Sequence, residues 1–271
     1  MSNNESLLSK TKEIKKLAFE MVLKASTGHL GGSFSCAEIL VALYYGKIMR
    51  FDPKNPEWKD RDRFILSKGH ANNTYYAILS DLGYYEKSEL DNYCQYQSFL
   101  GNHCDKTVPG VEMITGSLGH GLGIACGISL GAKLSGENFR TFVVIGDGES
   151  QEGSIWEAAM FAAQHKLDNL VVFLDRNRLG SEDFTENTSG LNPLEKKWEA
   201  FGWRVKSIDG HSFPEIFAAL SDLNSKDLSS PLMIIANTIK GHGISFLENT
   251  PKAHHTVPRG EEIEIARGEL S

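Results

Sequence analysis

Short apolar runs alternate with longer segments of helical spacing in the second half of the chain, and this alternation constrains the fold more than any other feature. Apolar strands that alternate with helices are typical of parallel βαβ units, in which helices cover both faces of one sheet. The sequence therefore predicts an α/β fold built on a doubly wound, mostly parallel sheet. The predicted strands are residues 141–145, 169–175, 203–208 and 231–238, and the predicted helices between them are 154–166, 192–201 and 213–223.

The first half of the chain predicts more helices and one further strand. Residues 7–26 space their apolar side chains as an amphipathic helix, and Ser35 with Glu38 forms a capping-box pattern that would begin a second helix after a loop. Residues 64–67 are predicted to form a short buried strand. Residues 117–134 predict a glycine-rich helix, and because each glycine costs up to about 1 kcal/mol against alanine, we expect another group to approach its backbone closely.

Composition narrows the class of protein. The 271 residues are 41% hydrophobic and 23% charged, which is typical of a soluble globular protein with a large core. A net charge of −7 argues against nucleic acid as the main partner, because phosphate backbones attract excess Lys and Arg. The four cysteines form no CxxC pair, and no apolar run resembles a signal peptide or a membrane span. We therefore expect a cytoplasmic protein that contacts no membrane.

Polar residues follow two of the predicted strands, at the edge where ligands bind in such folds. Asp147 lies between two glycines after residues 141–145, and Asn177 follows residues 169–175, with room for one helix between them. An ordinary strand-end turn also explains a lone glycine–aspartate–glycine, but the order turn, helix, strand and asparagine is more specific. A carboxylate, an amide oxygen and a backbone carbonyl suit Mg²⁺ or Ca²⁺, with phosphate oxygens completing the shell. The glycines would let a diphosphate approach the backbone.

Residues 146–177 resemble the thiamine diphosphate motif in the form that transketolases carry. The resemblance covers nearly the whole chain, because further family motifs occur in the family's order at residues 26–35, 60–71, 109–122 and 239–249. It implies that residues 1–271 form a single thiamine diphosphate-binding domain of the transketolase type. The implied reaction is the transfer of a two-carbon ketol unit from a ketose, such as a ketose phosphate, to an aldose acceptor. In that reaction the cofactor is the electron sink.

The resemblance also implies roles for individual residues. Asp147, Asn177 and the carbonyl of Leu179 would hold Mg²⁺, for which Ca²⁺ or Mn²⁺ can substitute. Imidazoles ordinarily titrate near neutrality, so histidines would exchange protons with the sugar. The implied catalytic residues are His29, His70, His103 and His254. The implied cofactor-binding residues are His70, Gly116, Ser117, Leu118, Gly146, Asp147, Gly148, Glu149, Asn177, Leu179 and His254.

Several polar residues keep open or structural interpretations. His254 is preferred over the adjacent His255 because the surrounding segment aligns with the family through that choice. Glu152 either lies at a subunit interface or complements the dipole of the helix that it precedes. His120 is predicted to be structural, and no role is assigned to the histidines His165, His211 and His242.

The resemblance finally implies a partner. Transketolases take the activating glutamate from a second, pyrimidine-binding domain, and the arginines that grip the sugar phosphate also lie outside the region that this chain resembles. We expect these groups on a second, carboxy-terminal subunit. The predicted assembly is an α₂β₂ heterotetramer that acts on a small sugar in carbohydrate metabolism and is active only when both chain types are present. Two alternatives are the α subunit of a thiamine-dependent 2-oxo acid dehydrogenase and a non-catalytic cofactor-binding partner.

Overall fold

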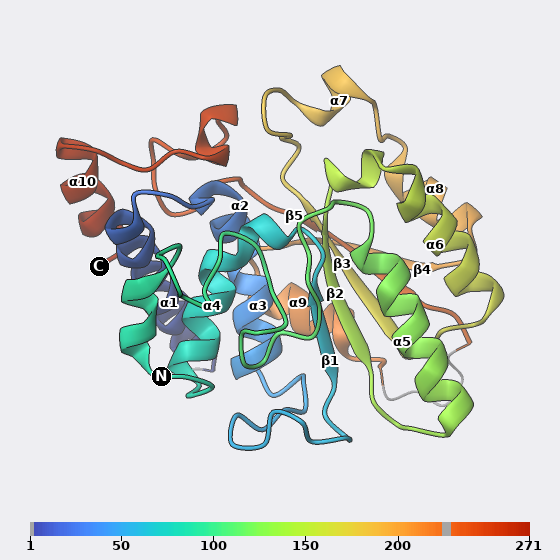
Figure 1. Cartoon of the computed structure of the whole chain (residues 1–271). Helices are drawn as coiled ribbons and strands as arrows, with labels where there is room; N and C mark the ends of the chain where they lie inside the picture. The colour runs from blue at the N-terminus through green and yellow to red at the C-terminus, as the bar shows by residue number, and fades with distance from the viewer. Residues whose placement is uncertain (1–2, 224–228) are drawn as a thin grey trace.

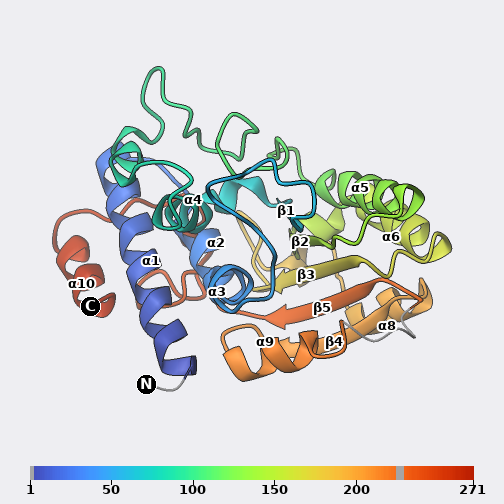
Figure 2. The same ribbon diagram turned by 90° about the horizontal axis from the view of Figure 1, so that it is seen from below.

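The computed structural model describes residues 3–223 and 229–271, and within them the chain builds one parallel sheet. Figure 2 shows the strands side by side in the order β1-β2-β3-β5-β4. Every predicted strand is confirmed. β2, β3 and β5 are continuous apolar runs buried between two helical layers, whereas β4 is a partly exposed strand at the edge of the sheet. The strands are β1 (Arg63–Leu66), β2 (Thr141–Gly146), β3 (Leu170–Arg176), β4 (Arg204–Asp209) and β5 (Leu232–Asn237).

Helices cover both faces of the sheet, as the alternating pattern predicts (Figure 1). One layer consists of α1 (Asn3–Ala25), α3 (Ala37–Tyr45), α4 (Asn72–Asp81) and α9 (Phe213–Leu220). The opposite layer consists of α5 (Gly121–Ser135), α6 (Gly153–Gln164) and α8 (Leu194–Ala200). The remaining helices are α2 (Leu30–Ser35), α7 (Thr185–Thr188) and α10 (Glu261–Glu269), with 3₁₀ turns η1 (Gly69–Ala71), η2 (Lys87–Asn92), η3 (Glu149–Gln151) and η4 (Pro251–His254).

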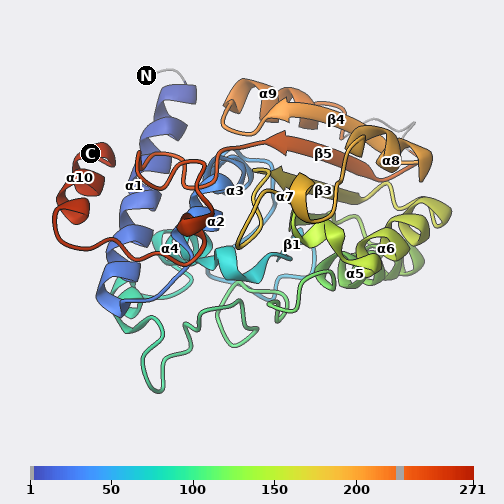
Figure 3. The ribbon, with the colours of Figure 1, turned by 90° about the horizontal axis from the view of Figure 1, so that it is seen from above.

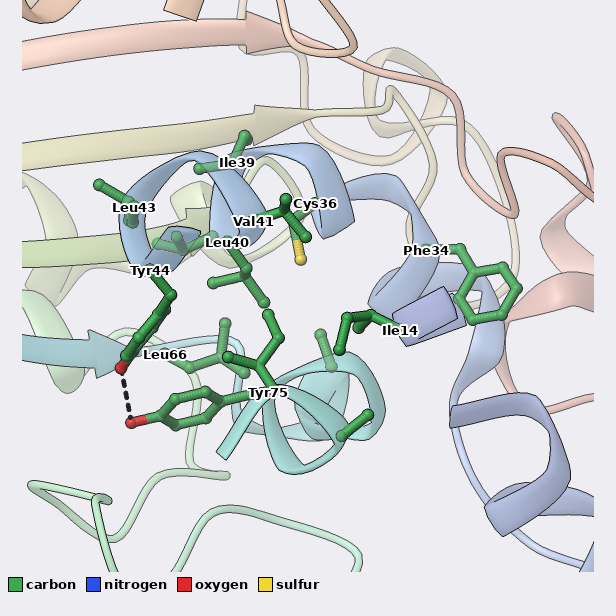
Figure 4. Packing of buried hydrophobic residues seen from close by; sticks show 14 of the residues in the cluster. Ile14, Phe34, Cys36, Ile39, Leu40, Val41, Leu43, Tyr44, Leu66 and Tyr75 are labelled. Atoms are coloured by element: carbon green, nitrogen blue, oxygen red, sulfur yellow. Dashed lines mark hydrogen bonds between the residues drawn. The ribbon is translucent and has the colours of Figure 1, made fainter. Parts of the chain in front are cut away.

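The two hydrophobic cores follow from the alternation of side chains along each strand. In β2, Phe142 and Val144 enter the core beneath α1, α3 and α4, whereas Val143 and Ile145 enter the core beneath α5 and α6. Figure 4 shows the first of these cores, where the hydroxyls of Tyr44 and Tyr75 lie 3.3 Å apart. Burial of one large apolar side chain contributes about 1.5–3 kcal/mol, so these layers hold the strand ends in place.

The candidate ligand residues lie at the carboxyl ends of neighbouring strands. β2 pairs directly with β3, and Gly146 lies opposite Asp175 in the register. Asp147 and Asn177 therefore come to the same edge of the sheet, as the spacing of the two strands predicts. Figure 3 shows α2 and the red segment at η4 meeting near this edge, although residues 30–35 and 251–254 are far apart in the sequence.

The predicted capping box at Ser35 is wrong. Residues Leu30–Ser35, predicted as part of a loop, form α2, and the next helix begins at Ala37 with no side-chain cap. The hydroxyl of Ser35 instead donates to Asp175 at 2.6 Å, and Glu38 pairs with Lys15. Ser35 therefore bonds to the buried carboxylate of Asp175 in β3 and, contrary to the local pattern, does not cap the helix.

The glycine-rich helix is confirmed, but it begins at Gly121 rather than at Ser117. The expected close approach holds only at its start, where a Cβ on Gly121 would meet the Ser67 hydroxyl at 2.3 Å. Farther along α5, a Cβ built on Gly123, Gly127 or Gly131 would meet no described atom within 4 Å apart from the neighbouring backbone of the helix itself. Among the described residues, no helix is both long enough and apolar enough to cross a membrane.

Candidate cofactor and metal site

A cavity of about 430 Å³ opens at the carboxyl edge of the sheet, a volume typical of small-ligand sites. It gathers residues from segments spread over more than 200 positions of sequence. Of the residues proposed from the sequence, Ser117 is absent from the cavity wall and its side chain is exposed. Those that do line it are His29, His70, His103, Gly116, Leu118, Gly146, Asp147, Gly148, Glu149, Asn177, Leu179 and His254.

Asp147 and Asn177 present oxygens at one end of the cavity. Asp147 is 1% exposed, and its carboxylate accepts hydrogen bonds from the backbone of Gly148 and Arg178. The side-chain oxygen of Asn177 accepts from the Leu179 amide at 3.1 Å, which fixes the loop that carries the third proposed ligand. Burial and the nearby Asp175 charge raise the pKa of Asp147 to about 6. A bound cation would remove this electrostatic cost, so the donor set fits a hard divalent metal.

Glu149 holds the neighbouring turns together. Its buried carboxylate accepts from the backbone amides of Gly119 at 2.9 Å and Gly146 at 3.0 Å, and from the hydroxyl of Ser67. These bonds join the ends of β1 and β2 to the turn before α5, where Gly116 and Leu118 face the cavity. Glu149 therefore shapes the wall of the cavity through hydrogen bonds to its backbone.

Histidines gather at the other end of the cavity. The ring of His29 lies 5.4 Å from that of His70, 5.9 Å from His103 and 5.3 Å from His254, measured between centroids. The structure places His254 in the cavity wall, whereas His255 packs 4.7 Å from His29 outside the lining. Four loops that are distant in sequence thus converge on one cluster of imidazoles.

The pKa values of all four imidazoles are lowered, and those of His29, His70 and His254 lie far below the near-neutral range expected from an ordinary imidazole. Burial and the neighbouring imidazoles lower the pKa of His29 to about 3, and burial with the Lys240 charge lowers that of His254 to about 4. Burial and the Lys68 ammonium likewise lower the pKa of His70 well below its usual range, and burial lowers that of His103. Near pH 7 all four rings are neutral, so each offers one donor and one acceptor to a ligand hydroxyl.

Sequence reasoning missed two lysines in the cavity wall. Lys68 follows β1 and is buried, and its ammonium pairs with Asp175 and donates to the Gly32 carbonyl at 3.0 Å. Lys240 follows β5, and its ammonium donates to the Gly180 carbonyl at 2.5 Å and lies 3.3 Å from Nδ1 of His254. The signal for both was a lysine just after a predicted strand, at the edge where ligands bind.

Sequence reasoning also missed Arg176, which lies beside the proposed metal ligands. Its guanidinium lies 3.3 Å from the Asp147 carboxylate and donates to Thr185 and Glu186. This side chain ties the loop of residues 178–190 to the carboxylate that would hold the metal. Glu152, whose role the sequence left open, precedes α6 as an exposed residue without a side-chain capping bond.

The cavity suits an elongated anionic ligand with a polar ring at its other end. Two lysine ammoniums and a backbone glycine, Gly148, line the same cavity as Asp147, which matches a metal-bound diphosphate. At the opposite end, Nδ1 of His29 is buried without a hydrogen-bond partner among the described residues, so it has an unmet bond to offer a ligand. Thiamine diphosphate with a divalent ion meets both requirements.

The fold and this cavity define a cofactor-binding α/β domain. Comparison with known proteins identifies the family to which this domain belongs. Residues 8–271 match the family described as the thiamine diphosphate binding domain of transketolase. The chain belongs to the transketolase family.

Relatives of known name fall into two size classes. The chain is 43% identical to the 6-deoxy-6-sulfo-D-fructose transketolase subunit SqwG of Clostridium sp. (strain MSTE9), over 95% of this chain and 93% of that protein. It is 40% identical to an apulose-4-phosphate transketolase subunit of Phocaeicola vulgatus, over 98% and 94%. It is also 36% identical to human transketolase, but there 92% of this chain covers 40% of the relative.

Solved transketolases share the fold. The Campylobacter jejuni transketolase superposes with a TM-score of 0.90 at 32% identity, over 98% of this chain and 43% of that one. The Leishmania mexicana transketolase gives a TM-score of 0.91 at 28% identity, over 100% and 41%. The chain thus matches less than half of a single-chain transketolase and nearly all of proteins named as transketolase subunits.

Proposed function

We propose that this chain is the amino-terminal, cofactor-holding subunit of a two-chain transketolase, which transfers a two-carbon ketol unit from a ketose, such as a ketose phosphate, to an aldose. The observation that supports this most directly is one cavity whose wall combines a metal-type oxygen set with a cluster of four histidines. The test is an assay of the chain, combined with its partner subunit, against a panel of ketose donors and aldehyde acceptors.

In this proposal the metal end of the cavity binds and orients the cofactor. Asp147, Asn177 and the Leu179 carbonyl hold Mg²⁺, while Gly148 contacts the diphosphate through its backbone. Lys68 and Lys240 add two positive charges on the same wall. Leu118, which lines the cavity beside Gly116, is the apolar side chain that supports the rings.

The histidine end of the cavity binds the sugar and manages protons. When bound, thiamine diphosphate supplies the electron sink that lets a carbon–carbon bond of the ketose break. Neutral His29, His70, His103 and His254 hydrogen-bond the sugar hydroxyls and carbonyl, and one of these rings takes up the proton that a hydroxyl releases. The low pKa values keep His29 and His254 unprotonated at neutral pH, so each ring has a nitrogen free to accept a hydrogen bond from a sugar hydroxyl.

The proposed partner is a second chain with a pyrimidine-binding domain, in an α₂β₂ assembly. Two observations support it: relatives that match over more than nine-tenths of their own length are named as subunits, and apolar side chains are exposed on α5 and α6. Leu134 is 80% exposed and Met160 is 53% exposed, and a partner subunit would cover such apolar surface. The 2-oxo acid dehydrogenase and non-catalytic alternatives have no comparable support in the structure.

Replacing His70 by Ala should lower turnover by about 10²–10⁴-fold, the usual contribution of an acid–base group. The measurement is kcat of the two-chain enzyme, with thermal unfolding of the variant recorded alongside. His165→Ala is the matched control, because His165 is an exposed histidine at the end of α6 and does not line the cavity. Turnover near that of the wild type would show that His70 has a structural and not a catalytic role.

Because Lys240 lines the cavity, we expect its charge to make the affinity for the cofactor depend on pH. Burial, with the Lys68 charge, lowers the pKa of Lys240 to about 8, so the ammonium loses its proton as the pH rises through this value. An anionic diphosphate binds the charged form better, so its affinity should fall by about tenfold between pH 7 and pH 9. Calorimetric titrations at both pH values check this, and Lys240→Met should bind weakly with no such fall. A wild-type affinity that is constant across this range contradicts the assignment.

A further inference from the structure

A second polar cluster lies behind the cavity wall. It joins Glu38 of α3, His211 of the turn before α9 and His242 of the segment after β5, with ligand-type atoms within 4.8 Å of one another. A metal does not suit this cluster, because the ammonium of Lys15 already lies 2.8 Å from the Glu38 carboxylate and both side chains are only 5% exposed. The cluster is a buried ion pair extended by imidazoles.

The hydrogen bonds of His211 define its protonation state. The backbone N–H of Ile239 donates to Nε2 at 2.9 Å, so Nε2 carries no proton. Nδ1 therefore carries the proton and donates it to the Glu38 carboxylate, also at 2.9 Å. His211 is thus a neutral imidazole in a single tautomer, with both nitrogens engaged, and it bridges α3 to the chain just after β5.

The same cluster fixes the backbone on both sides of Lys240. Ile239 precedes Lys240 and is held by His211, while the carbonyl of His242 accepts from Lys15 at 3.0 Å. The ring of His242 also packs 3.8 Å from the ring of His211. Lys240 itself projects the other way, into the cavity, where its ammonium meets the Gly180 carbonyl.

We propose that His211 is a positioning residue for the cofactor: by holding Ile239 it sets the place of the Lys240 ammonium in the cavity wall. A lysine side chain has four rotatable bonds, so the charge is well placed only if its backbone is fixed. The bond from Ile239 and the pairing with Glu38 supply that constraint from outside the cavity. This inference rests on the proposed role of Lys240 in binding the diphosphate.

Two substitutions separate the two bonds of His211. His211→Asn keeps an amide donor near the position of Nδ1 and loses the acceptor for Ile239, whereas His211→Gln keeps an acceptor near Nε2. In the two-chain protein with Mg²⁺, His211→Asn should weaken thiamine diphosphate binding by about tenfold, the scale of one charge-assisted contact. His211→Gln should retain most of the affinity. Equal affinity for His211→Asn and the wild type would overturn the proposal.

A double-mutant cycle shows whether His211 acts through Lys240. The double variant His211→Asn with Lys240→Met should bind no more weakly than Lys240→Met alone, because coupled residues are not additive. Fully additive losses would overturn the proposal and leave His211 with a general structural role. Failure of the wild-type complex to bind the cofactor would instead overturn the proposed function itself, and with it this inference.

Hydrogen exchange gives a readout that needs no cofactor. In the two-chain protein without cofactor, the Ile239 amide should exchange faster in His211→Asn than in the wild type, and His211→Gln should restore its protection. Thermal unfolding of both variants shows that each is folded. Unchanged protection of this amide in folded His211→Asn would contradict the constraint on which the proposal depends.

Discussion

Replacing Asp147 by Asn should remove Mg²⁺-dependent binding of thiamine diphosphate, with a loss of more than about 100-fold in affinity. Even supporting contacts at metal sites contribute about 10–100-fold, and Asp147 is the only carboxylate among the three proposed ligands. The substitution keeps the size of the side chain and one acceptor oxygen, so the backbone donors of Gly148 and Arg178 are not both left unpaired. Calorimetric titration of the two-chain protein, with and without Mg²⁺, measures the effect.

The same substitution should not unfold the protein without cofactor, which separates binding from stability. The pKa of Asp147 in the folded chain is raised from 3.8 to about 6, so the folded state binds this proton more tightly than the unfolded state does. The free energy of unfolding therefore falls as the pH rises from about 4 to about 6, and the charged form is a cost above that range. Asparagine carries no such cost, so Asp147→Asn should melt no lower than the wild type at pH 7.

A matched surface control is Asp168→Asn. Asp168 pairs with Lys133 at 2.6 Å, and both side chains are about one-third exposed, so this change should leave cofactor affinity unaltered. Wild-type affinity and Mg²⁺ dependence in Asp147→Asn would show that the metal is held elsewhere.

Features encoded by nearby residues could be predicted from the sequence. The central strands β2, β3 and β5 are continuous apolar runs, because both of their faces are covered by helices. Asp147 and Asn177 follow strands with one helix between them, and that connection makes the strands neighbours. The insertion of β5 between β3 and β4 had no such local signal, because strand order depends on how helices pack across the sheet.

Features that depend on distant residues were missed. Lys68 and Asp175 are 107 positions apart, and no periodicity links them, yet they form a buried pair beneath the cavity. Ser35 donates to the same carboxylate, which is why its capping pattern misled the helix prediction. The histidine cluster was proposed from family resemblance alone. Its low pKa values required knowledge of burial and of the neighbouring lysines, neither of which the sequence displays.

The purified single chain should show no ketol transfer, and addition of the second subunit should restore it. The chain matches 40% of human transketolase but 93% of a protein named as a transketolase subunit, so the remaining functional groups are expected on a partner. In the family resemblance these groups include the glutamate that activates the cofactor. Steady-state assays at increasing partner concentration measure the recovery, and light scattering should report two copies of each chain.

Cofactor affinity provides the second measurement of this dependence. Suppose that the partner binds the chain with bound thiamine diphosphate more tightly than the chain without it. By linkage, the affinity for thiamine diphosphate must then rise as partner is added. Obligate interfaces commonly bury more than about 2,000 Å², enough to cover the exposed apolar residues Leu134 and Met160. Reconstitution with Asp147→Asn should stay inactive, which assigns the recovered activity to this chain's cavity. Ketol transfer by the single chain, free of any partner, would refute the two-chain proposal.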